Sequence, residues 1–155
     1  MPRAWFVNKV IAMPSADVLQ TIKRGKDPDE QPFDPAETAL MDKDDLGERK
    51  IALPPSGASA GREVSVTRYD LQRIDLRTRN PQAGFLVLSE VYYPGWIARV
   101  DGVETPIHRV NSTLRGLEVP AGDHEISYVY EAPTFRLEPV INFKKVSLQR
   151  SLTSE

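Results

Sequence analysis

Residues 84–130 read GFLVLSEVYYPGWIARVDGVETPIHRVNSTLRGLEVPAGDHEISYVY. Four apolar, β-prone runs alternate here with three turn signals, which are Pro94-Gly95, Asp101-Gly102 and Ala121-Gly122-Asp123. Asp-Gly between two alternating runs is a strong hairpin signal, because a type I′ turn needs positive φ at both central residues. The stretch therefore predicts an antiparallel meander in which Val100 lies opposite Val103.

The same two-residue turn fixes a longer register if the strands continue. It places Arg99 opposite Glu104 as an exposed pair and Trp96 opposite Ile107. Pro106 cannot donate to a ladder, so residues 103–110 are expected to form an edge strand. Residues 120–123 are expected to form a type I turn with a left-handed glycine between the runs 114–119 and 124–130.

The N-terminal part contains mixed signals. Residues 4–13 predict one strand, and residues 16–24 predict a short helix that plugs the β core, with Ser15 as N-cap and Gly25 at the C-terminus. Asp34 to Glu37 resembles a capping box that opens a short turn through Leu40. The remaining expectations are a solvated loop over 41–50, a short strand over 51–54 and a flexible linker over 55–61.

Two further runs precede the meander. Residues 63–69 alternate well, but residues 71–78 follow after only Asp70, which is too short for a hairpin loop. Either residues 69–71 bulge within one long bent strand, or the two runs lie in different sheets. Residues 79–84 form a loop, and residues 85–91 are apolar on both faces, which is typical of a strand inside a sandwich.

These elements predict a mostly β fold, an antiparallel β-sandwich of jelly-roll-like type, with about eight strands and one or two short helices near the N-terminus. One domain is expected over residues 1–136, because 155 residues are enough for a single core. It comprises an N-terminal lobe (1–54), the linker (55–61) and the main β region (62–136). Residues 137–155 are expected to be a partly disordered tail.

Composition excludes several classes of function. The net charge is −2 with acids and bases interspersed, so nothing favours a nucleic-acid partner. The absence of cysteine removes disulfides, thiolate metal sites and a cysteine nucleophile. Neither a signal peptide nor an apolar run of 18 residues occurs.

No pattern indicates catalysis, a metal or a cofactor. His108 and His124 lack metal-ligand spacing and are expected to be exposed strand residues. Asp42, Asp44 and Asp45 lack the EF-hand spacing, so a solvated loop is the better interpretation. The motifs of serine hydrolases, P-loops and Rossmann folds do not occur.

The most specific chemical feature is the aromatic run Tyr92-Tyr93-Pro94-Gly95-Trp96. Aromatic rings beside a turn can stack on the apolar face of a sugar, and the candidate hydrogen-bonding partners are Arg99, Asp101, Asn111 and Arg115. The alternative is that Trp96 and one tyrosine fill the core while Pro-Gly sets the corner. A solvent-facing platform of Tyr92, Tyr93 and Trp96 would favour sugar binding, and buried rings would favour a structural role.

The stretch from Leu86 to Pro133 resembles the C-terminal soluble region of the bacterial YfhO family of polytopic membrane proteins. The matching pieces are the strand into Tyr93-Pro94-Gly95-Trp96, Asp101-Gly102, Arg115-Gly116, the run 120–124 and the closing run 128–130. The segments 2–5 and 33–35 are also similar, so the resemblance covers residues 2–136. In the family a long membrane region precedes this part and a return to the membrane follows it, whereas here Met1 stands before Pro2 and residues 135–155 are polar.

The resemblance implies that the parent proteins are membrane glycosyltransferases that use lipid-linked sugars, with catalytic carboxylates in the membrane half. This chain would then be a non-catalytic accessory domain on the extracytoplasmic face of the bacterial cytoplasmic membrane. Its partners would be the membrane domain of the parent protein and a glycan or lipid-linked sugar. The alternative is a free-standing carbohydrate-binding or adhesion module. A small hydrolase is a weaker third hypothesis, because no catalytic constellation supports it.

Overall fold

The structure is a computed structural model that describes residues 2–47, 51 and 61–132. Two short helices lie in its N-terminal part, α1 (Ser15–Arg24) and α2 (Lys43–Leu46). The described residues also form eleven strands: β1 (Ala4–Val7), β2 (Lys9–Met13), β3 (Thr38–Asp42), β4 (Glu63–Tyr69), β5 (Arg73–Asn80), β6 (Gly84–Val91), β7 (Trp96–Val100), β8 (Val103–Thr105), β9 (His108–Val110), β10 (Leu114–Val119) and β11 (Gly122–Tyr130).

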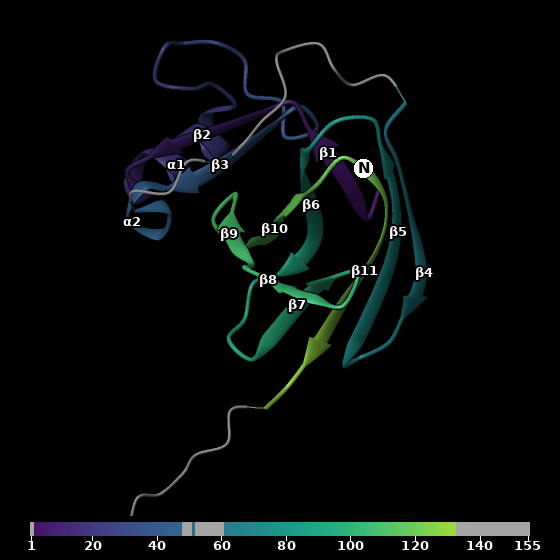
Figure 1. Cartoon of the computed structure of the whole chain (residues 1–155). Helices are drawn as coiled ribbons and strands as arrows, with labels where there is room; N and C mark the ends of the chain where they lie inside the picture. The colour runs from purple at the N-terminus through teal and green to yellow at the C-terminus, as the bar shows by residue number, and fades with distance from the viewer. Residues whose placement is uncertain (1, 48–50, 52–60, 133–155) are drawn as a thin grey trace, which may run out of the picture.

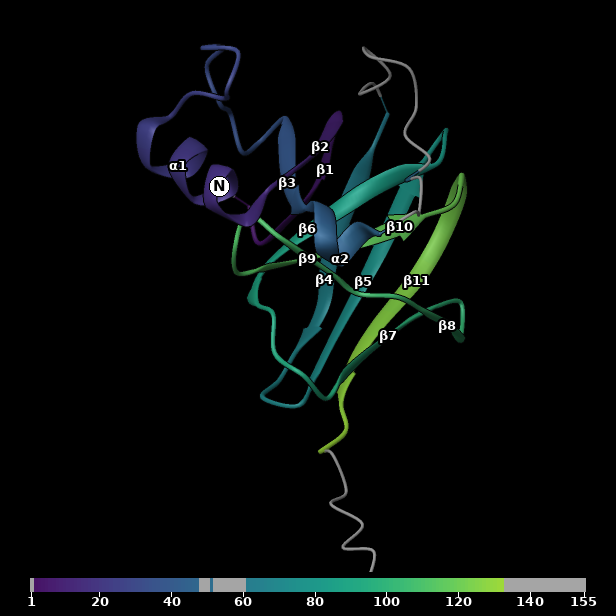
Figure 2. The ribbon, with the colours of Figure 1, turned by 90° about the vertical axis from the view of Figure 1, so that its left-hand side faces the viewer.

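The strands form two sheets that pack face to face (Figures 1 and 2). One sheet has the order β1-β6-β10-β9-β3-β2, and the other has the order β4-β5-β11-β7-β8. Alternate residues of β5 and β11, including Ile74, Leu76, Ile126 and Tyr128, point into the core between the sheets. The expected β-sandwich is confirmed, whereas its jelly-roll version stays a prediction.

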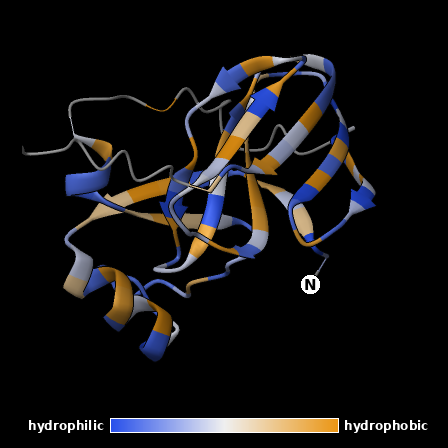
Figure 3. Cartoon of the chain, turned by 90° about the horizontal axis from the view of Figure 1, so that it is seen from below, coloured by the Kyte–Doolittle hydropathy of each residue, from blue (hydrophilic) through white to orange (hydrophobic). Residues whose placement is uncertain are grey.

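Strand β6 is buried on both faces, as its apolar run predicts. Leu86 and Leu88 belong to the core between the sheets, whereas Phe85 and Val87 belong to a second cluster on the other face. Leu46 of α2 and Ile51 pack against that second cluster. Along several other strands, such as β4 and β5, hydrophobic and hydrophilic residues alternate (Figure 3), as expected for a sheet with one face in the core.

Residues 4–13 form two strands instead of the single one expected. The break lies at Asn8, and it separates β1, which pairs with β6, from β2, which pairs with β3. The β2–β3 pair is parallel, because the chain crosses over through α1 between these strands. The sheet that contains them is therefore mixed, whereas the sequence predicts a purely antiparallel one.

The expected turn through Leu40 and the expected solvated loop after it are wrong. Asp34 does accept a hydrogen bond from the backbone of Ala36 at 2.8 Å, but the turn ends before β3 begins. In β3, Leu40 and Met41 are fully buried. Helix α2 follows, and Asp45 forms an ion pair with Arg109 at 3.0 Å. The apolar run Ala39 to Met41 is too short to predict a strand from the sequence.

Helix α1 agrees with prediction within one residue. Gly25 ends it in the left-handed conformation with φ of 67°. The expected N-cap is wrong: Pro14 occupies that position, and its carbonyl accepts hydrogen bonds from Asp17 and Val18. Val18 packs on Met13 and Leu40, so the helix closes one edge of the molecule.

The Asp101-Gly102 hairpin is confirmed. Both residues have positive φ, 50° and 82°, and Val100 pairs with Val103. The expected register fails beyond Thr105: the strand stops at Pro106, and His108–Val110 joins the other sheet as β9. The expected pairing of Trp96 with Ile107 is therefore wrong, while the edge position of β8 is correct.

The meander is also wrong as a whole, because the chain changes sheet several times. Strand β10 pairs with β6 and β9, whereas β11 pairs with β5 and β7, so residues 120 and 121 cross between the sheets. Conversely, β4 and β5 do form a direct hairpin. The link between them is three residues long, because β5 begins only at Arg73. Both expected arrangements, one long bent strand and two runs in different sheets, are therefore wrong.

Three expectations fall largely outside the described residues. These are the short strand over 51–54, of which only Ile51 is described and is not in a strand, the linker over 55–61, and the tail over 137–155.

Candidate functional site

The aromatic run forms the loop between β6 and β7, and backbone hydrogen bonds fix it on both sides. The Tyr92 N–H donates to the carbonyl of Thr113 at 2.6 Å. The Gly95 carbonyl accepts from the Glu131 N–H at 2.7 Å, and Gly95 itself has φ of 99°. A β-carbon is strongly disfavoured at that φ, so glycine allows the sharp corner from which Trp96 enters β7.

The rings of this loop pack on Tyr130 at the end of β11. The ring centroids of Trp96 and Tyr130 lie 5.7 Å apart, and those of Tyr93 and Tyr130 lie 6.2 Å apart. The guanidinium carbon of Arg115 lies 4.0 Å from the centroid of the Trp96 ring. One face of Trp96 is thus occupied by a cation, which is a favourable contact for an indole.

An open groove of about 480 Å³ runs beside this cluster. We call it the aromatic groove. Its walls come from the 92–95 loop, the start of β7, the end of β8 and the segment that follows; its lining residues are Tyr92, Tyr93, Pro94, Gly95, Trp96, Ile97, Ala98, Glu104, Thr105, Pro106 and Ile107. Tyr92 and Tyr93 are 37% and 59% exposed, and Trp96 is half-buried. All three predicted aromatic residues therefore meet in one groove.

The exposure of these rings falls between the two alternatives considered from the sequence. Trp96 packs against the core cluster, as a structural role requires. Tyr93 remains mostly exposed, as a binding platform requires. The loop therefore holds Trp96 against the core and leaves the ring of Tyr93 accessible to a ligand.

Arg115 supports the groove from the interior. It is only 4% exposed, and its Nε donates to the Val91 carbonyl at 2.9 Å. Burial lowers the pKa of its guanidinium and raises the pKa of the nearby Tyr128 hydroxyl. A guanidinium is effectively always protonated in proteins, so Arg115 keeps its positive charge. Its charge is fixed behind Trp96 and is not offered to the groove.

The other predicted polar residues do not converge on the aromatic groove. Arg99 forms an ion pair with Glu131 at 3.5 Å, instead of one with Glu104. Asn111 accepts a hydrogen bond from the Leu40 N–H at 2.8 Å, and it thereby joins β3 to the turn after β9. Its role is structural.

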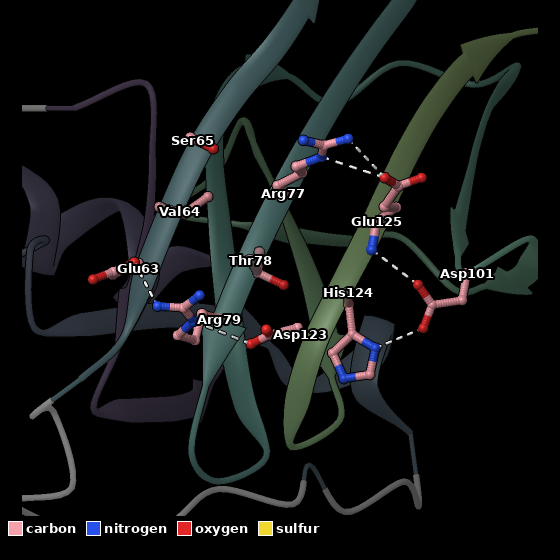
Figure 4. A pocket seen from close by; sticks show the side chains of 10 residues that line it. All are labelled: Glu63, Val64, Ser65, Arg77, Thr78, Arg79, Asp101, Asp123, His124 and Glu125. Atoms are coloured by element: carbon pink, nitrogen blue, oxygen red, sulfur yellow. Dashed lines mark hydrogen bonds and ion pairs between the residues drawn. The ribbon is translucent and has the colours of Figure 1, made fainter.

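Asp101 lies in a second, charged hollow of about 470 Å³ on β4, β5 and β11 (Figure 4). Arg79 lies between Glu63 and Asp123, and Arg77 pairs with Glu125 at 3.1 Å. These opposite charges on neighbouring strands compensate one another, as cross-strand pairs do on an exposed sheet face. The hollow is therefore a surface of paired charges.

Both histidines differ from the exposed residues that were expected. His108 is 6% exposed and packs near Phe85. The Nδ1 of His124 lies 2.6 Å from Asp101, and this hydrogen bond raises the pKa of His124 and lowers that of Asp101 (Figure 4). The pair ties the β7–β8 turn to β11. Within the described ranges, no group of three or more potential metal-binding side chains comes together.

Sequence reasoning missed four residues of this region: Tyr130, Glu104, Thr105 and Pro106. The contact of Tyr130 with Trp96 requires the β7–β11 pairing, which joins distant segments. Glu104 to Pro106 reach the groove because β8 folds back on β7. The Asp101-Gly102 turn could have predicted this position, because its register places Thr105 opposite Ala98.

Eleven strands in two packed sheets define the described part of the chain as a β-sandwich domain. A family model described as bacterial membrane protein YfhO matches residues 58–142, which is more than half of the chain, so this chain belongs to the YfhO family. The match begins at residue 58, so the similarity expected for segments 2–5 and 33–35 lies outside the matched residues. Comparisons with curated proteins and with solved structures found no match. Among the residues that the structure describes, none of the helices is both long and apolar enough to cross a bilayer.

Proposed function

We propose that this chain is a non-catalytic, extracytoplasmic accessory domain of a YfhO-type membrane protein, and that its aromatic groove contacts a glycan or the sugar of a lipid-linked saccharide. The reaction of the parent protein would take place in its membrane domain. The domain described here would hold or orient the saccharide.

The observation that carries the proposal is that Tyr92, Tyr93 and Trp96 line one groove together with Glu104 and Thr105. The C–H bonds of a sugar ring carry partial positive charge, and the face of an aromatic ring is negative, so the two stack favourably. A carboxylate and a hydroxyl beside the rings can bond the sugar hydroxyls. Apolar walls with a few polar groups are the usual composition of a small-ligand site.

The rigidity of the groove also supports binding. Trp96 is fixed between Arg115 and Tyr130, and the 92–95 loop has backbone hydrogen bonds on both sides. A ligand therefore need not order these groups when it binds, and less entropy is lost.

The direct test is a glycan array probed with the unmodified chain and with two variants, Tyr93→Ala and Tyr69→Ala. Tyr93 lines the groove and is 59% exposed, so removing its ring should not unfold the domain. We expect affinity for the best saccharide to fall by about tenfold, the equivalent of about 1.4 kcal/mol and within the range of a single aromatic contact.

Tyr69 is the matched control, because it is 49% exposed and does not line the groove. Its replacement should leave saccharide affinity unchanged. No binding by the unmodified chain, or equal losses in both variants, would refute the saccharide function.

A further inference from the structure

Exposed apolar side chains gather at one end of the sandwich. Of the nine large hydrophobic residues that are exposed in the described chain, five lie on this end, and we call them the aromatic end: Tyr69, Leu71, Val91, Tyr92 and Tyr93. Leu71 is 97% exposed at the tip of the β4–β5 hairpin. An exposed leucine on the same end of the molecule as three exposed tyrosines indicates a surface that contacts something other than water.

The loops of this end are joined to one another. The Tyr130 N–H donates to the Gln72 carbonyl at 2.9 Å, which links β11 to the β4–β5 turn. The Tyr69 hydroxyl donates to Glu90 at 2.8 Å. Figures 1 and 2 both show the β4–β5 turn, the 92–95 loop and the end of β11 at the lower end of the molecule. The β4–β5 turn and the 92–95 loop, which carry most of the aromatic end, are therefore both tied to the end of β11.

Three arginines of the described part of this surface have acidic partners. Arg3 pairs with Glu90 at 2.7 Å, Arg68 with Asp70 at 2.5 Å, and Arg73 with Asp75 at 2.9 Å. The surface is thus close to neutral, with tyrosines and one projecting leucine. This is the composition that suits the interface of a bilayer, where tyrosine lies at the headgroup level with its hydroxyl in water.

We infer that the aromatic end rests on the lipid bilayer, with Leu71 inserted among the headgroups. The bilayer is the occupant that fits, because the chain belongs to a family of membrane proteins and because the described residues of this surface combine exposed apolar side chains with paired charges. The inference depends on the membrane setting of the proposed function, but not on saccharide binding. The aromatic groove shares Tyr92 and Tyr93 with this end, so it would open at the bilayer surface, where the sugar of a lipid-linked saccharide is displayed.

The test is co-sedimentation of the full chain with vesicles, without any saccharide. Two vesicle compositions are needed, pure phosphatidylcholine and a mixture of phosphatidylethanolamine with phosphatidylglycerol. We expect binding to both, with little change between 50 and 500 mM NaCl, because paired charges leave little net attraction to anionic lipid. Leu71→Glu should lower the partition coefficient by at least about tenfold, since it replaces the inserted apolar side chain with a charge.

Val103→Glu is the matched control. Val103 is apolar and 69% exposed, but it pairs with Val100 at the opposite end of β7 from Trp96. Both variants add the same charge, so a membrane contact through the aromatic end predicts a loss only for Leu71→Glu. No sedimentation of the unmodified chain, equal losses in both variants, or binding only to anionic vesicles at low salt would overturn the inference.

Self-association would overturn it as well, and sedimentation velocity of the same samples detects that outcome. If the chain forms a dimer that Leu71→Glu dissociates, and neither form binds vesicles, the aromatic end is a protein interface. Failure of the saccharide function leaves this test unaffected, because the vesicles carry no sugar and Leu71 does not line the groove.

Discussion

Gly116 in β10 is the position where one added carbon should disturb the fold most. A β-carbon built there lies 2.4 Å from Cζ and 2.5 Å from Cε1 of Phe85, and 3.0 Å from Cγ1 of Val110. Carbon atoms in contact prefer about 3.5–4.0 Å, so the Phe85 ring would have to move by roughly 1 Å or more. Phe85 and Val110 are both fully buried, so neither can swing into solvent.

We therefore expect Gly116→Ala to lower the free energy of unfolding by about 3 kcal/mol, the upper part of the usual range for overpacked cores. In a chain of this length, that change lowers Tm by roughly 6–12 °C. Urea unfolding followed by tryptophan fluorescence, together with thermal unfolding by circular dichroism, measures both quantities.

Gly84→Ala is the matched control. Its β-carbon would lie 3.0 Å from the Phe6 ring, which is only partly buried and can shift, so a loss below about 1 kcal/mol is expected. Phe85→Leu removes the two atoms that clash at Gly116, so the double variant should be more stable than the sum of the single effects predicts. If Gly116→Ala is as mild as Gly84→Ala and shows no coupling to Phe85→Leu, the packing of β10 on β6 described here is wrong.

Three other predictions concern side chains around the candidate site. Protonated His124 stabilises the folded chain; this contribution is complete below the ordinary pKa of 6.5 and is lost as pH rises through the raised pKa of His124. Ionised Asp101 also stabilises the folded chain; its contribution is complete above the ordinary pKa of 3.8 and is lost as pH falls through the lowered pKa of Asp101. The stability difference between the unmodified chain and Asp101→Asn should therefore be largest between these two pH values and smaller at pH 9, and a flat difference in urea unfolding would contradict this. Asn111→Ala should cost about 1–3 kcal/mol in the same assay, because it leaves the buried Leu40 N–H without its acceptor at 2.8 Å; a neutral effect would contradict the structural role of Asn111. Arg115→Lys should cost about 1.5–3 kcal/mol, because lysine lacks the planar group that bonds Val91 and covers Trp96, and equal stability would contradict the buried contact.

Local sequence patterns correctly predicted those features of the fold that depend only on neighbouring residues. The Asp101-Gly102 turn set the register of β7 and β8, Gly25 ended α1, and the apolar run of β6 indicated burial on both faces. Each of these features depends on neighbours within a few residues. The pattern of β4 was recognisable for the same reason.

Pairing between distant segments could not be derived in this way. An alternating strand has the same pattern in either sheet, so nothing local shows that β10 and β11 separate while β11 pairs with β5. Strand β3 was missed because its buried part is only Ala39 to Met41. Its partners β2 and β9 come from distant parts of the sequence.

In the candidate site, too, residues that are adjacent in sequence were grouped correctly and residues placed by distant pairings were not. Tyr92, Tyr93 and Trp96 were predicted as a unit, since they are adjacent in sequence, and they do meet in one groove. Arg99, Asp101, Asn111 and Arg115 were grouped with them only by proximity along the chain. Of these four, Arg115 lies behind Trp96. Arg99 pairs instead with Glu131, Asp101 with His124, and Asn111 with the Leu40 N–H.

The central claim, that saccharide binds in the aromatic groove, is tested most directly by NMR titration of the ¹⁵N-labelled chain. The individual probes are glucose, galactose, N-acetylglucosamine and N-acetylgalactosamine, each at millimolar concentration. We expect saturable shifts for at least one sugar, confined to residues 92–98 and 104–107 and to the Trp96 indole N–H. Shifts centred instead on the charged hollow around Arg79 and Asp123, or no shifts with any of the four sugars, would contradict it.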